Sequence, residues 1–204
     1  ALMIGVVSAM GGLSFRIPRA DRLKVALRTA FEMGAMVAFL LALTNMPIAN
    51  ATAILAALPL CITLGAALFF REPLGWRRIT AVLVGAVGVL LIVQPGTDGF
   101  NSASLYALAA VAMVTGRDLV TRSFGAEVPS MGVAVITAFA VALLGGVLSV
   151  RETWVGFDAE NLIYLVLAAV FIIGGYTLSI LVMRVGEVSA VAPFRYTALV
   201  FALI

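Results

Sequence analysis

Long runs of apolar residues dominate the chain, and short clusters of charged or turn-forming residues separate them. A helix needs about 20 apolar residues to cross the hydrocarbon core of a bilayer. Because the backbone of a lipid-embedded segment must satisfy its own hydrogen bonds, and because the runs lack the alternation of β-barrel strands, they predict transmembrane helices. The apolar segments, about eight crossings in all, are residues 1–14, 29–45, 48–70, 79–95, 103–120, 130–149, 161–183 and 188–204.

The connectors between these segments are short, so consecutive helices are expected to run antiparallel. Residues 46–47 leave room only for a tight helical hairpin, while Pro73 and Gly75 favour a turn before the following helix. No stretch has the composition of an extramembrane domain, so we expect an all-α membrane protein, a multi-pass transmembrane helical bundle. Residues 1–14 are too few to span, and the last apolar segment runs to Ile204, so we interpret the sequence as a fragment of a longer protein.

Basic residues lie in alternate connectors, and this distribution predicts the orientation of the bundle. Lysine and arginine are enriched in the cytoplasmic loops of membrane proteins. Ten of the 13 basic residues lie in one set of connectors, whereas the opposite set contains only Arg151. The basic set includes residues 15–28 and 71–78, and we expect these two loops to be cytoplasmic.

Composition supports the membrane class and excludes several kinds of chemistry. Hydrophobic residues are 63% of the 204 residues and charged residues only 11%, whereas a soluble domain has about 25% charged residues. With no histidine and one cysteine, Cys61, the chain offers no internal disulfide and no Ser/His pair. We therefore predict no catalytic residues, no metal and no cofactor. Nucleic-acid binding is not indicated, because orientation already explains the basic connectors.

Charged residues inside the spanning segments are candidates for function, because they are costly in lipid. They are Glu32, Arg117, Asp118 and Arg195. Glu32 can pair with Arg28, four residues earlier on the same helix, or with Arg117 across two helices. Arg117 can instead extend its side chain to the membrane interface. We group Glu32, Arg117 and Asp118 as a candidate intramembrane charge network.

Arg195 is the deepest of these charges, roughly 10 Å into its segment at the helical rise per residue. Pro193 loosens the helical hydrogen bonding beside it, and Tyr196 adds an aromatic ring. This combination fits a cavity that holds an anionic or zwitterionic solute, although a purely structural cation is the alternative. Asn50 and Thr52 are polar positions in an apolar helix, where helix packing is the alternative role. The candidate solute-binding residues are Arg195, Tyr196, Asn50, Thr52 and Tyr176.

Two prolines, Pro59 and Pro193, are the predicted helix-breaking positions. Pro59 cannot donate a backbone hydrogen bond to the carbonyl of Leu55. The segment 48–70 should therefore bend or open near its middle, where flexible backbone could lie beside a solute path.

The order of the segments indicates an internal repeat. A shift of 140 residues lays Gly34 on Gly174 and the segment 48–70 on the segment 188–204. The aligned residues differ, and what repeats is a long helix, a very tight turn and a helix rich in small residues. The two copies would cross the membrane in opposite directions, which is the inverted arrangement of many secondary transporters.

Three stretches within residues 43–96 carry a resemblance to a known family: LTNMPIANATAILAALPL, ALFFREPLGWRR and AVLVGAVGVLLIVQPG. They contain a mid-helix proline, Pro59, a glutamate after the helix, Glu72, and the pair Pro95–Gly96. GEVSAVAPFRYTALVFALI, at the end of the sequence, looks similar. In these features the chain resembles the drug/metabolite transporter superfamily, and within it the EamA-type ten-helix permeases.

The resemblance implies two inverted repeats of five helices, residues 1–96 and 103–204, with the first and last helices outside this sequence. It implies a secondary transporter, a permease or exporter, that moves a small organic metabolite or drug across the bacterial cytoplasmic (inner) membrane by alternating access. No nucleotide-binding motif occurs, so coupling to a proton or ion, or simple exchange, is left open. The competing reading is a membrane-embedded enzyme or a non-transporting helical bundle. The sequence does not predict the solute, the direction or the oligomeric state.

Overall fold

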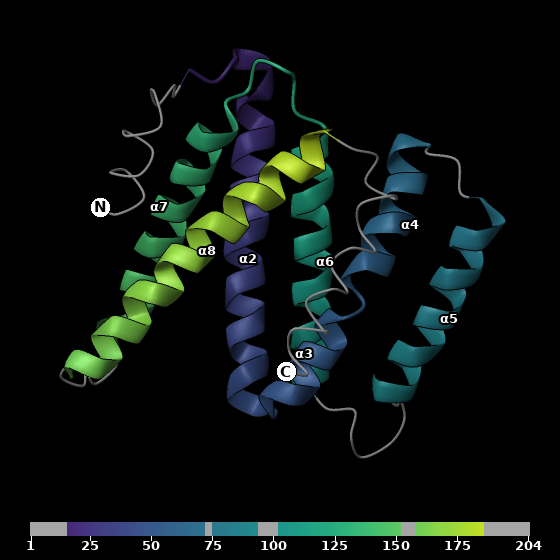
Figure 1. Ribbon diagram of the computed structural model, residues 1–204, viewed down its shortest axis with the longest axis horizontal. Coiled ribbons are helices and arrows are strands. Elements are labelled where there is room, and N and C mark those ends of the chain that lie inside the picture. Colours follow the sequence, from purple (N-terminus) through teal and green to yellow (C-terminus); the bar gives the residue numbers. More distant parts are fainter. Residues whose placement is uncertain (1–15, 72–74, 94–101, 152–157, 186–204) are drawn as a thin grey trace.

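The computed structural model describes residues 16–71, 75–93, 102–151 and 158–185 (Figure 1). Every regular element in these ranges is a helix, which confirms the predicted all-α fold. The elements are η1 (Arg19–Asp21), α2 (Arg22–Asn45), α3 (Ile48–Leu55), α4 (Leu58–Phe70), α5 (Trp76–Val93), α6 (Ser102–Arg122), α7 (Ser130–Leu148), η2 (Ser149–Arg151) and α8 (Ala159–Val185).

The helices coincide with the predicted apolar segments, and the multi-pass membrane class is confirmed. Helices long and apolar enough to cross a bilayer occupy Arg19–Asn45, Asn50–Phe70, Ser102–Arg122 and Ser130–Leu148. α5 and α8 lie where two further crossings are predicted. Large apolar side chains such as Leu68 and Phe171 are 76% and 77% exposed, as expected for surfaces that face lipid. The predicted segments 1–14 and 188–204 lie outside the described residues.

Successive crossings alternate in direction, with α3 and α4 together forming one crossing, as the short connectors predict (Figure 1). The start of α2, the end of α4, the end of α6 and the start of α7 all lie toward one end of the bundle, the top of Figure 1. The last turn of α8 reaches the same end. The described parts of the basic connectors therefore gather on one side.

The antiparallel pair α2 and α6 forms the centre of the bundle and its most extensive helix–helix contact. Small residues allow this close approach, which is typical of helices packed in membranes. Gly34 lies against Met113, and Gly116 lies against Phe31. A Cβ atom at Gly116 would be 2.9 Å from Cζ of Phe31, so a larger residue cannot fit without a shift. The fully or nearly fully buried alanines of the two helices include Ala35, Ala42, Ala103, Ala107 and Ala110.

The predicted segment 48–70 is divided into two helices. α3 ends at Leu55, α4 begins at Leu58, and Pro59 lies in the first turn of α4. At Ala57 the backbone N–H bonds to the carbonyl three residues earlier, on Ile54, which tightens the chain locally. The helix is interrupted where Pro59 predicts it, because proline has no backbone N–H to donate to the carbonyl four residues earlier.

α4 and α5 extend the bundle on one side of the central pair, and α7 and α8 on the other (Figure 1). Gly65 on α4 lies against Leu119 on α6, and Gly85 on α5 lies against Leu60 on α4. α7 packs against α2, and α8 crosses over α6 and α7 at an angle. This crossing leaves the space in which the candidate site lies.

Candidate functional site

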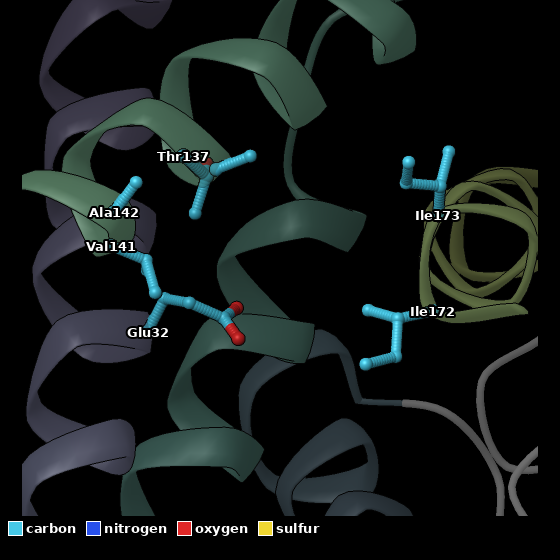
Figure 2. A pocket seen from close by; sticks show the side chains of 7 residues that line it. Glu32, Thr137, Val141, Ala142, Ile172 and Ile173 are labelled. Carbon is cyan, nitrogen blue, oxygen red and sulfur yellow. The ribbon is translucent and has the colours of Figure 1, made fainter. Parts of the chain in front are cut away.

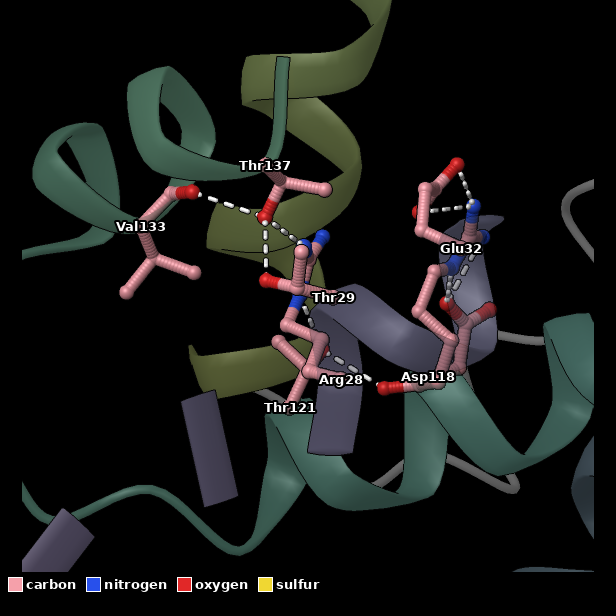
Figure 3. A network of polar contacts seen from close by, with 8 residues as sticks. Arg28, Thr29, Glu32, Asp118, Thr121, Val133 and Thr137 are labelled. Atoms are coloured by element: carbon pink, nitrogen blue, oxygen red, sulfur yellow. Dashed lines mark hydrogen bonds and ion pairs between the residues drawn. The ribbon is translucent and has the colours of Figure 1, made fainter. Parts of the chain in front are cut away.

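Charged and hydroxyl side chains meet inside the bundle where α2, α6 and α7 come together (Figure 3). The most deeply buried of them, at most 3% exposed, are Arg28, Asp118, Thr121 and Thr137. Polar groups at such depth in membrane helices are retained where they bind one another or a ligand. The members of this polar cluster are Arg28, Thr29, Glu32, Arg117, Asp118, Thr121 and Thr137.

Arg117 links two carboxylates on two helices. Its NH1 atom donates to both carboxylate oxygens of Glu32 at 3.1 Å. Its Nε atom donates to Oδ1 of Asp118 at 2.8 Å, and its NH2 atom lies 2.8 Å from the same oxygen. The structure thus brings together the three residues grouped as a charge network. The Arg117 side chain is 13% exposed and points across to α2 rather than out to the interface.

Arg28 joins three helices through one guanidinium group. It lies on α2, donates from Nε to Oγ1 of Thr121 on α6 at 2.9 Å, and donates from NH1 to Oγ1 of Thr137 on α7 at 2.8 Å. The apolar pattern predicts that Arg28 lies in a connector before the helix, and this prediction is wrong. α2 begins at Arg22, so Arg28 is inside the helix and only 2% exposed.

The proton positions around Thr137 follow from its hydrogen bonds. Its hydroxyl donates to the carbonyl oxygen of Val133 at 2.9 Å. A hydroxyl has one proton, so toward Arg28 the Thr137 oxygen can only accept. Oγ1 of Thr29, 3.3 Å from the Thr137 oxygen, is therefore the donor in that contact. The Thr121 hydroxyl likewise donates to a carbonyl one turn earlier and accepts from Arg28.

The polar cluster is formally neutral, with the guanidinium groups of Arg28 and Arg117 and the carboxylates of Glu32 and Asp118. Burying such an array carries a desolvation cost that mutual attraction and hydrogen bonds offset only in good geometry. A purely apolar contact would hold the helices without this cost, so the cluster points to function. Within the described ranges, no group of three or more metal-ligating side chains occurs.

A cavity of about 310 Å³ lies beside the polar cluster, between α2, α7 and α8 (Figure 2). This volume is within the range of about 300–1,000 Å³ that holds small organic ligands. Figure 2 shows the Glu32 carboxylate pointing toward the space between α7 and α8. Among the described lining residues, Glu32 is the charged one and most others are hydrocarbon. The lining residues are Glu32, Thr137, Ala138, Val141, Ala142, Ile172 and Ile173.

Asn50 and Thr52, two other predicted site residues, are not among the described residues that line this cavity. Asn50 and Thr52 lie on α3 with exposed side chains, and the Thr52 hydroxyl donates to the carbonyl of Ile48 at 2.9 Å. Tyr176 lies on α8, one turn beyond the two cavity-lining isoleucines. The candidates Arg195, Tyr196 and Pro193 lie outside the described residues.

The sequence analysis did not identify Thr137 or the α7–α8 wall. A signal for Thr137 was present, because it is the one hydroxyl residue between Ser130 and Ser149 in an otherwise apolar helix. No comparable signal marks Ile172 and Ile173, whose place in the cavity depends on how α8 crosses α7.

Comparison with known proteins identifies a family for part of the chain. Residues 1–94 match the EamA-like transporter family. The chain is 25% identical over 167 residues to an S-adenosylmethionine uptake transporter of Rickettsia prowazekii, covering 79% of this chain and 55% of that relative. It is 41% identical over 64 residues to a riboflavin transporter of Vibrio cholerae, covering 31% of this chain and 22% of that relative.

A riboflavin transporter of Rhizobium johnstonii is 33% identical over 108 residues, which covers 52% of this chain and 34% of that relative. The chain therefore spans about half the length of the S-adenosylmethionine uptake transporter and less of the two riboflavin transporters. No solved structure matches the chain. The match over residues 1–94 agrees with the resemblance to EamA-type permeases seen in the sequence.

Proposed function

We propose that the full-length protein is a secondary transporter that moves a small organic metabolite or drug across the bacterial cytoplasmic membrane. The observation that carries this proposal is the match of residues 1–94 to the EamA-like transporter family. The relatives' names, S-adenosylmethionine uptake transporter and riboflavin transporter, support a small organic solute and a transporter rather than an enzyme.

The cavity between α2, α7 and α8 is the proposed place for the solute. Its volume of about 310 Å³ and its largely hydrocarbon wall suit a small organic molecule. Glu32 connects the cavity to the α2–α6 contact through its ion pair with Arg117. The proposed solute contacts also include Arg195, Tyr196, Tyr176, Asn50 and Thr52.

Alternating access between two inverted halves, residues 1–96 and 103–204, is the proposed mechanism. The direction of the helices supports it. A shift of 140 residues carries α2 onto residues 162–185, which fall within α8. α2 and α8 run in opposite directions in Figure 1, as inverted copies would. Coupling to a proton or ion, or exchange of solutes, would supply the driving force.

Orientation and location are also proposed. The basic ends of the helices gather on one side of the bundle, and the positive-inside rule makes that side cytoplasmic. The connector before α2, which begins at Arg22, and the connector 71–78 would then face the cytoplasm.

An uptake-and-efflux screen with the full-length protein in proteoliposomes tests the proposal. We expect protein-dependent flux of at least one organic solute, and we expect Ala138→Phe, which fills the cavity, to abolish it. Leu143→Phe is the matched control, because Leu143 lies on the same helix, is 56% exposed and is not part of the cavity wall. Absence of flux across metabolite and drug panels, in both directions, would contradict the proposed function.

A further inference from the structure

We infer that the cavity takes a positively charged, hydrogen-donating group of its solute, with the Glu32 carboxylate as the acceptor. This inference rests on the proposed function, because it names the chemistry of the solute to be moved. Three features of the site support it: the polar atoms of the cavity wall, the sharing of Arg117 between Glu32 and Asp118, and the hydrocarbon surface of the cavity.

The described cavity wall presents acceptors to a solute. Ala138, Val141 and Ile173 have hydrocarbon side chains. The single hydroxyl proton of Thr137 is donated to the carbonyl of Val133, so the Thr137 oxygen can only accept. Both carboxylate oxygens of Glu32 accept hydrogen bonds from Arg117, so this group likewise presents acceptors. Backbone N–H groups inside the helices are already bonded along the helix. The bound solute must therefore supply the donors.

The charge at the wall favours a cation. Glu32 lines the cavity with its side chain 18% exposed, whereas Arg117 is not among the lining residues. Asp118, the other carboxylate, has a side chain only 4% exposed. A solute group that enters the cavity therefore meets the Glu32 carboxylate first, with the Arg117 guanidinium behind it. At the described wall a carboxylate solute would meet the like charge of Glu32 and no side-chain donor, whereas an ammonium group would find a charge-assisted hydrogen bond in apolar surroundings.

Arg117 can release Glu32 without becoming unpaired. Its NH1 atom donates the hydrogen bonds to Glu32 at 3.1 Å. Its Nε and NH2 atoms hold Asp118 at 2.8 Å. A solute cation that takes over the Glu32 carboxylate thus breaks one polar link between α2 and α6, while Arg117 keeps its partner on α6 and Arg28 keeps its bond to Thr121. Solute binding would in this way loosen the central helix pair.

The hydrocarbon wall adds a second requirement. Val141 and Ala142 on α7 face Ile172 and Ile173 on α8 across the cavity (Figure 2). This surface suits an apolar body attached to the charged group. A zwitterion fits as well, with its ammonium group at Glu32 and its acidic group elsewhere on the path.

Charge-opposed probes of similar shape test the inference on the purified full-length protein in nanodiscs. We expect 2-phenylethylammonium to bind in calorimetry and 3-phenylpropionate not to bind. Glu32→Gln should weaken ammonium binding about tenfold or more, which is the loss of one charge-assisted hydrogen bond. Ala138→Phe should remove binding without touching the ion pair, which covers the case in which Glu32→Gln folds poorly. Glu127→Gln, at an exposed carboxylate in the α6–α7 connector, is the control and should bind as the unmodified protein does.

Three outcomes would overturn the inference: no ammonium binding to the unmodified protein, tighter binding of the carboxylate probe, or unchanged ammonium binding in Glu32→Gln. The solute screen in proteoliposomes is independent of these binding measurements. Flux limited to anions or neutral solutes would leave the transporter proposal intact and overturn the inference. Ammonium binding that depends on Glu32, without flux of any solute, would instead support the site and contradict the transporter proposal.

Discussion

A single buried side chain, Arg28, holds three membrane helices together. Its donors reach Thr121 on α6 and Thr137 on α7 at 2.9 and 2.8 Å, and both hydroxyls direct their own protons elsewhere. The guanidinium is rigid and planar, so its hydrogen bonds to Thr121 and Thr137 fix how far apart α6 and α7 lie beside α2. These hydrogen bonds hold the polar cluster beside the cavity.

Arg28→Ala should destabilise the protein, because it removes the charge-assisted hydrogen bonds that Arg28 donates to Thr121 and Thr137. We expect a loss of about 2 kcal/mol or more in unfolding free energy. Arg28→Lys should recover part of the lost unfolding free energy, since the ammonium group keeps the charge but lacks the planar, forked donors of the guanidinium. Thermal unfolding of the full-length protein in detergent measures both. Arg22→Ala, at an exposed position of the same helix, is the control, and an equal loss there would contradict the role of Arg28.

At the scale of helices, the sequence predicts where the chain crosses the membrane better than where each helix ends. Charged residues are excluded from the hydrocarbon, so Arg22, Lys24 and Arg28 mark the predicted boundary of a span. These residues are nevertheless good helix formers, and α2 continues through them from Arg22. Lys24 also bonds to Asp21 and to the carbonyl of Ser123, both at 2.8 Å, which anchors the helix start to the α6–α7 connector.

The Glu32–Arg117 pair could be predicted as one of two alternatives, because both are costly charges within spans that could meet. The cavity could not be predicted. Its wall joins α7 to α8, and the residues Ile172 and Ile173 differ in no way from their apolar neighbours in the sequence. Which of them faces the cavity depends on the crossing of two helices, and no local pattern encodes that crossing.

Pro59 should matter for transport more than for assembly. Pro59→Ala restores a backbone donor and should join α3 and α4 into one helix, removing the interruption between Leu55 and Leu58. We expect a transport rate at least several-fold lower at equal expression, measured in proteoliposomes. Cys61→Ala, one turn into α4, should leave the rate unchanged. Unchanged kinetics in Pro59→Ala would show that the proline serves packing alone.

Two helical glycines offer a matched test of the α2–α6 contact. A Cβ at Gly116 would meet three ring atoms of Phe31 at 2.9–3.1 Å, whereas a Cβ at Gly146 would meet nothing within 4 Å. Gly116→Leu should therefore force the central helices apart and cost about 1–3 kcal/mol in unfolding free energy. Gly146→Leu should leave stability unchanged or slightly raised. Equal effects in thermal unfolding would contradict the close packing of this pair.

At the scale of the whole molecule, helix direction and charge agree. The chain alternates in direction from α2 to α8, and the basic connectors gather toward one end of the bundle (Figure 1). The positive-inside rule acts on the chain during insertion, before the helices pack. The agreement between charge distribution and packed structure therefore supports a single orientation for the bundle.

That orientation can be measured with cysteines at opposite ends of the bundle. Arg19→Cys and Val150→Cys are introduced separately in full-length protein that also carries Cys61→Ala, so that each protein has one reactive thiol in the described region. Arg19 lies before α2 at the basic end, and Val150, 78% exposed, lies in η2 at the opposite end. An impermeant maleimide should label the Val150→Cys protein in intact cells and the Arg19→Cys protein only after permeabilisation, because most basic residues lie toward the Arg19 end and the positive-inside rule predicts that this end is cytoplasmic. Labelling in the reverse order would place the basic connectors outside and invert the proposed topology.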